Sequence, residues 1–127
     1  FIGKFYNFIK RKEMEGNEVR INIKPLSINE AYKGRKFSTI KLTWYKQDLN
    51  KLLPDNYKLP DPPYFISFVF GFSSQSSDWD NCIKTTQDAI ATKYNFNDKL
   101  IRRGLVDIEI VKKGNEFFTF KIEHLTK

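Results

Sequence analysis

The sequence predicts an α+β protein: a single domain with a mixed sheet of about four strands and two main helices packed on it. Four segments show strand periodicity or β-rich composition, and two carry apolar residues at helical spacing. Their order along the chain is strand, helix, strand, helix, strand, strand. The 127 residues are enough for one hydrophobic core and too few for two.

The first expected strand covers residues 19–24, where Val19, Ile21 and Ile23 alternate with polar residues, and Pro25 closes it. Residues 27–35 are polar with a glycine near the end, which is typical of a loop or a short hairpin.

A first helix is expected over residues 39–53, with Ser38 or Thr39 as its N-cap. Pro54 ends it. One face of this helix carries the apolar residues that we expect to be buried: Leu42, Tyr45, Leu49, Leu52 and Leu53.

Residues 64–72 are rich in Phe, Ile and Val and predict a central strand buried on both faces. A serine-rich loop, residues 73–77, follows it. A second helix is expected over residues 80–94, burying Ile83, Ile90 and Tyr94.

Two alternating segments close the domain, residues 106–110 and residues 118–122. Between them, residues 113–115 (Lys-Gly-Asn) have the composition of a hairpin turn. The sequence therefore predicts that these two strands pair as a hairpin.

Residues 1–18 are expected to form an N-terminal extension or arm to a domain of residues 19–127. Apolar residues at helical spacing stand beside the basic trio of residues 10–12 and permit an amphipathic helix. This segment is either a surface helix or an arm that touches DNA.

The net charge of +7 indicates a nucleic acid or an anionic membrane surface as partner. The longest apolar run has nine residues, far short of the roughly 20 that span a bilayer, so we expect no membrane insertion. The single Cys82 excludes an internal disulfide and a cysteine-based zinc site, and His124 is the only histidine. A reducing cytoplasm fits this composition.

The most informative segment carries Asp78, Asp80 and Lys84, with Asp98 following the second helix. Three carboxylates and one ammonium can hold a hard divalent cation against a phosphodiester, because Mg²⁺ takes oxygen ligands and leaves positions for water and phosphate. The alternative is structural: an aspartate N-cap, an ordinary Asp80–Lys84 pair and a turn residue at position 98.

Other chemically active side chains are expected to be structural. Cys82 has no histidine near it and is typical of a small buried residue. Most tryptophans and phenylalanines are expected in the core, although Trp79, Tyr32 or Tyr45 could stack on a base.

The run Asp78-Trp-Asp80-Asn81-x-x-Lys84-x-x-x-Asp88, with the later Asp98, resembles the RusA-type Holliday junction endodeoxyribonucleases of phages and bacteria. Upstream, the segment from Pro25 through Ser27 to Asn29 resembles that family's Pro-x-Ser-x-Asn motif, followed by a tyrosine and a basic loop. The resemblance extends over about residues 19–123.

The resemblance implies that Asp78, Asp80 and Asp98 bind Mg²⁺, with Mn²⁺ as a substitute, and that Lys84 assists catalysis. It also implies a homodimer that nicks four-way junction DNA on two strands, in a bacterial or phage-infected cytoplasm. The DNA-binding residues expected upstream are Asn29, Tyr32, Lys33, Arg35 and Lys36.

Two features depart from the family pattern. Serines fill residues 73–77, where relatives often carry arginines, and Asp98 is one residue closer to the preceding motif than expected. Two other functions stay open: a non-catalytic DNA-binding protein on the same scaffold, and a structural or partner-binding phage protein.

Overall fold

The computed structural model describes residues 18–34 and 37–126. Within these ranges the chain forms one small α+β domain, as the sequence predicts. The expected N-terminal helix, and Arg35 and Lys36 of the basic loop, lie outside the described residues.

A mixed four-stranded sheet forms the base of the domain, in the order β1-β6-β4-β5. The strands are β1 (Val19–Ile21), β4 (Tyr64–Phe72), β5 (Ile101–Ile110) and β6 (Phe117–His124). Strand β4 pairs antiparallel with β6 and parallel with β5, and β1 pairs antiparallel with β6. The prediction of a mixed sheet around a central strand at residues 64–72 is therefore confirmed.

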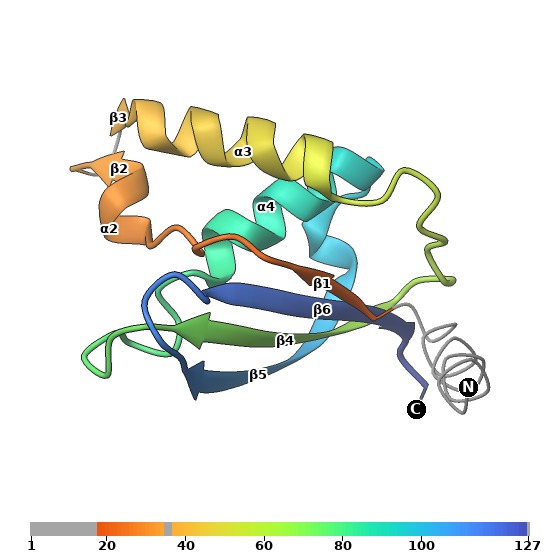
Figure 1. The fold of residues 1–127 in the computed structure, drawn as a ribbon. Helices are drawn as coiled ribbons and strands as arrows, with labels where there is room; N and C mark the ends of the chain where they lie inside the picture. The colour runs from red at the N-terminus through yellow and green to blue at the C-terminus, as the bar shows by residue number, and fades with distance from the viewer. Residues whose placement is uncertain (1–17, 35–36, 127) are drawn as a thin grey trace, which may run out of the picture.

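One expectation for β4 is only half right. Its residues facing the helices, from Tyr64 to Phe72 at every second position, are buried, but Phe65, Ser67 and Val69 on the opposite face are half-buried. The described helices lie on the first face of the sheet, and none of them covers the second face (Figure 1).

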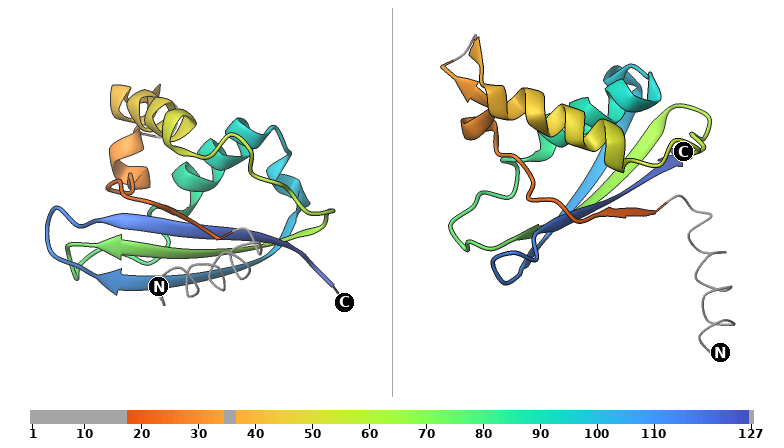
Figure 2. Two further views of the ribbon diagram at one scale, coloured as in Figure 1. Left: turned by 45° about the vertical axis from the view of Figure 1, so that its right-hand side comes forward. Right: turned by 45° about the horizontal axis from the view of Figure 1, so that its top comes forward.

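Helices α3 (Ile40–Leu52) and α4 (Ile83–Tyr94) lie on the same side of the sheet, as both views of Figure 2 show. The Tyr45 hydroxyl of α3 and the Thr86 hydroxyl of α4 are 2.7 Å apart in the buried contact between them. Leu52, expected in the core, is the last residue of α3 and is 51% exposed.

The predicted hairpin of the last two strands is wrong. The backbone does reverse after residue 112, where Asn115 N–H donates to the Lys112 carbonyl (2.9 Å) and Gly114 has a φ of 97°. However, β4 lies between β5 and β6. The α4 crossover brings β5 in parallel on one edge of β4, so β6 takes the other edge.

The polar segment before α3 is more regular than expected. It forms a short helix, α2 (Ile28–Ala31), and a small hairpin of β2 (Tyr32–Lys33) with β3 (Phe37–Ser38). The Ser27 hydroxyl accepts from Glu30 N–H and donates to the Glu30 carboxylate, both at 3.2 Å. Ser27 is therefore the side-chain N-cap of α2, which the Ser-x-x-Glu pattern of residues 27–30 permits and which was not predicted. Strand β1 ends at Ile21, earlier than the alternation suggested.

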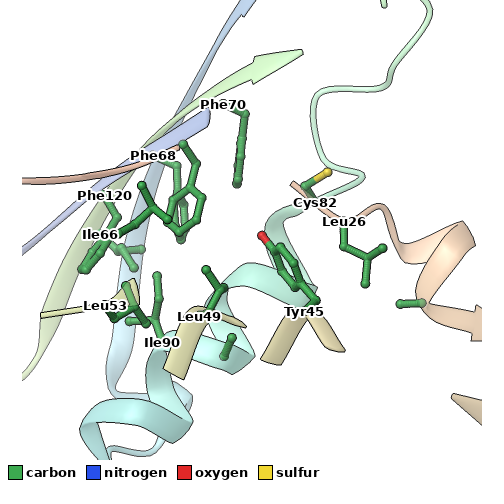
Figure 3. Packing of buried hydrophobic residues seen from close by; sticks show 14 of the residues in the cluster. Leu26, Tyr45, Leu49, Leu53, Ile66, Phe68, Phe70, Cys82, Ile90 and Phe120 are labelled. Atoms are coloured by element: carbon green, nitrogen blue, oxygen red, sulfur yellow. The ribbon is translucent and has the colours of Figure 1, made fainter. Parts of the chain in front are cut away.

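The core fills the space between the sheet and the two long helices. Figure 3 shows phenylalanines of β4 and Phe120 of β6 pointing toward Leu49 and Leu53 of α3 and Ile90 of α4. Trp44 and Trp79, expected mostly in the core, are 56% and 60% exposed: Trp44 lies on the exposed face of α3, and Trp79 lies in the turn before α4. Within the described ranges, no helix is long and apolar enough to cross a bilayer.

Candidate functional site

Asp78 and Asp80 lie in the turn that joins the serine-rich loop to α4. Asn81 N–H donates to the Asp78 carbonyl (3.2 Å) and Ile83 N–H to the Asp80 carbonyl (3.3 Å). The helix therefore begins at Ile83, three residues later than predicted, because Asp and Asn favour such local turns over a helix interior.

Both of these aspartates are exposed. In the part of the chain that the structure describes, no ion pair or side-chain hydrogen bond holds either carboxylate. The expected helical pair of Asp80 with Lys84 is not formed.

Lys84 lies in the first turn of α4, and its ammonium contacts two other carboxylates. Lys84 Nζ is 3.2 Å from Asp88 Oδ1 and 3.5 Å from Asp98 Oδ2. The hydrogen bond and charge of Asp88, and more weakly those of Asp98, raise the pKa of Lys84 above its ordinary value. The side chain is therefore a permanent cation at neutral pH and cannot serve as a general base.

Asp98 opens a short 3₁₀ helix, η1 (Asp98–Leu100), after the chain has turned back beyond α4. The reversal uses Asn95, which has a left-handed φ of 57° at the C-cap. Helix α4 carries the chain about 18 Å away from the turn of Asp78 and Asp80. Asp98 thus approaches Lys84 from the opposite end of the helix.

The structure does not gather the three predicted metal ligands. Among the described residues, no three Asp, Glu, His or Cys side chains lie close enough together to hold a metal ion. Asp78 and Asp80 share one turn, whereas the contacts of Asp98 are with Lys84.

Lys84 also lines a surface cavity of about 590 Å³ with the upstream motif. The other lining residues are Ile28, Asn29, Tyr32 and Gly34. Two segments about 55 residues apart in the sequence, each assigned to DNA contact or catalysis, thus meet at one hollow. Gly34 has a φ of 72° and supplies the tight turn of the β2–β3 hairpin beside it.

Buried hydrogen bonds set the position of the upstream motif against α4. Ile28 N–H donates to the Asn81 carbonyl (2.8 Å), and the Thr85 hydroxyl donates to the Leu26 carbonyl (2.6 Å). Asn81 and Thr85 were not predicted to have this positioning role. Thr85 directly follows Lys84 in a run of polar residues, and nothing else in the sequence indicates that its hydroxyl would be buried.

The remaining predicted DNA-binding residues fall into two groups. Asn29, which is exposed, and Tyr32, which is half-buried, line the cavity, and Lys33 is exposed. Arg35 and Lys36 lie outside the described residues.

The other chemically active side chains differ in how accessible they are. Cys82 is buried, and burial raises the pKa of its thiol to about 12. His124 Nδ1 donates to the Asp61 carbonyl (2.7 Å). Tyr45 is only 5% exposed, which excludes base stacking by this ring, while Trp79 is accessible.

No protein-family model and no curated protein matches this sequence. The resemblance to RusA-type resolvases accordingly depends on the motif residues alone.

Proposed function

We propose that this protein is a Mg²⁺-dependent, structure-selective endodeoxyribonuclease that resolves four-way DNA junctions by paired nicks. The observation that carries the proposal is the cavity shared by Asn29, Tyr32 and Lys84. It unites the upstream motif, expected to contact DNA, with the lysine expected to assist catalysis.

The role assigned to Lys84 is electrostatic. An ammonium has three N–H donors, and two carboxylates engage this one, which leaves a donor for a phosphate oxygen. Fixed positive charge at the reacting phosphate stabilises the additional negative charge of the transition state. In this role Asp88 and Asp98 hold the lysine and keep it protonated.

The carboxylates suit Mg²⁺ in their chemistry, since this ion prefers oxygen ligands and often uses one or two carboxylates together with substrate phosphate. Asp78 and Asp80, exposed in one turn, are the pair able to hold it; a three-ligand set that includes Asp98 is not assembled in this arrangement. When bound, the ion would polarise the phosphodiester and activate water.

The second candidate is a non-catalytic DNA-binding protein on the same scaffold. The separation of Asp98 from the aspartate pair favours it, because the Lys84 contacts alone are those of a structural ion-pair cluster. In that case Asn29, Tyr32 and Lys33 would still contact DNA.

The proposal predicts divalent-dependent cleavage. A labelled synthetic four-way junction is incubated with the protein in Mg²⁺, in Mn²⁺ and in EDTA, and the products are resolved on a denaturing gel. Paired nicks near the branch point in the metal-containing samples are expected. Junction binding without cleavage in any metal would favour the second candidate.

A matched pair of variants attributes any cleavage to this protein. Lys84→Ala should lose the activity, whereas Lys112→Ala, an exposed lysine in the β5–β6 turn, should retain it. Equal activity of the two variants would mean that the nicks come from a contaminant or from another site.

A further inference from the structure

A second cavity lies at the end of the sheet where β5 begins and β6 ends. Its volume is about 580 Å³, and it is lined by Pro63, Arg102, Arg103, His124, Leu125 and Thr126. These lining residues, all within the described ranges, include two arginines and one histidine and no aspartate or glutamate.

The two guanidinium groups are partly oriented by their neighbours. Arg102 Nε donates to the Lys99 carbonyl (3.1 Å), which leaves the terminal nitrogens of that group available. The Arg103 guanidinium carbon lies 5.8 Å from the centre of the Phe65 ring, its cross-strand partner in β4. Orientation of this kind lowers the entropy lost when a ligand binds.

The charge of these arginines is not neutralised by the protein. Among residues 18–34 and 37–126, neither Arg102 nor Arg103 forms an ion pair. Two acids close to them in register or sequence are engaged elsewhere: Glu123 with Lys121 at 3.5 Å, and Asp98 with Lys84. The cavity is therefore lined by two arginines that form no ion pair within the described ranges.

From these observations we propose that the Arg102–Arg103 cavity binds a phosphate group of a nucleic-acid backbone. The planar guanidinium fork matches two phosphate oxygens, and a hollow lined by two arginines and no acidic residue favours a phosphate over a neutral ligand. The assignment of that phosphate to DNA rests on the proposed function, whereas phosphate binding as such follows from the cavity alone.

The test compares two charge-matched double variants by DNA binding in EDTA, where no metal-dependent cleavage occurs. Arg102→Gln with Arg103→Gln removes the cavity charges, and Lys112→Gln with Lys113→Gln removes the same charge from the exposed β5–β6 turn. Affinity for labelled junction DNA is measured over a salt series. Loss of this phosphate contact should flatten the log–log salt slope by about 0.9 in the arginine variant only.

A conservative variant and a calorimetric arm complete the design. Arg102→Lys with Arg103→Lys should keep most of the salt slope while weakening binding several-fold, since an ammonium preserves the charge and loses the fork. Titration with inorganic phosphate asks whether the cavity takes a free phosphate. Circular dichroism verifies that each variant is folded.

Each outcome decides the proposal. Equal salt slopes for the double variant at residues 102 and 103 to glutamine and for the double variant at residues 112 and 113 overturn the assignment to a nucleic-acid backbone. If inorganic phosphate then binds the wild-type protein but not the arginine-to-glutamine variant, the site serves a free phosphate. Wild-type protein that binds no DNA at low salt also overturns it, together with the proposed function. A flattened slope in a protein that never cleaves DNA supports the cavity and contradicts only the nuclease.

Discussion

Gly71 in the central strand should not tolerate even a methyl group. It pairs with Phe117 of β6, and a Cβ built on Gly71 would lie 2.3 Å from Phe117 Cε1 and 2.4 Å from Cδ1. The ring cannot easily withdraw, because Phe117 is buried and the Arg20 guanidinium carbon lies 3.7 Å from the ring centre. Gly71→Ala is therefore an overpacking substitution.

The expected cost follows from that contact. Overpacking costs about 1–3 kcal/mol, and the lower entropy of the unfolded alanine chain offsets about 0.5–1 kcal/mol, so a net loss of about 1–2 kcal/mol is expected. With an unfolding entropy of about 2.1 cal/mol/K for each of 127 residues, the midpoint should fall by about 4–7 °C. Thermal unfolding followed by circular dichroism measures the shift.

Gly104 in β5 provides the matched control. A Cβ there would have the Ile66 carbonyl oxygen, at 3.9 Å, as its nearest neighbour, so Gly104→Ala should be neutral or slightly stabilising. Replacing Phe117 by leucine should reduce the cost of Gly71→Ala, giving a non-additive double-mutant cycle. If both alanine variants melt at the wild-type temperature, the packing of Phe117 on Gly71 does not limit this position.

Four further predictions concern the site and the chain. Asp80→Asn should abolish cleavage while junction binding persists or tightens, because one negative charge is lost near the phosphate; equal loss of both in gel assays would exclude a metal role. Lys84→Ala should lower kcat more than affinity, and a wild-type rate at saturating DNA would contradict the electrostatic role. The Cys82 thiol, with its pKa raised to about 12 by burial, should react with a thiol reagent at pH 8 only on unfolding; its contribution to stability is complete below the ordinary pKa near 9 and is lost as pH rises toward 12. Sedimentation at micromolar concentration should give a symmetric dimer of about twice 15.1 kDa, and a monomer that nicks both strands in one binding event would contradict this expectation.

The local character of most elements could be predicted from the sequence. Apolar spacing predicted α3 to within a residue, and the Phe-rich run predicted the central position of β4. These properties were accessible because periodicity and composition act over a few residues. The assignment of Lys84 and the upstream segment to one function came from the family resemblance and stays a prediction, whereas the cavity that they share was not predicted.

Other properties depended on contacts between distant segments. Nothing in residues 101–124 indicates that β4 lies between β5 and β6, since a turn sequence specifies reversal of the chain and not its pairing partner. Burial of Tyr45 and exposure of Trp44, only one residue apart, followed from which face of α3 meets the sheet.

The candidate site shows the same division. The residues carry its charges, but their distances depend on where α4 ends and how Asn95 reverses the chain. That path brings Asp98 back to Lys84 in the first turn of α4, whereas Asp78 and Asp80 lie together in the turn before that helix. Side-chain chemistry is a local property of the sequence. The distances between charged groups on separate segments depend instead on how the helix that joins those segments packs in the fold.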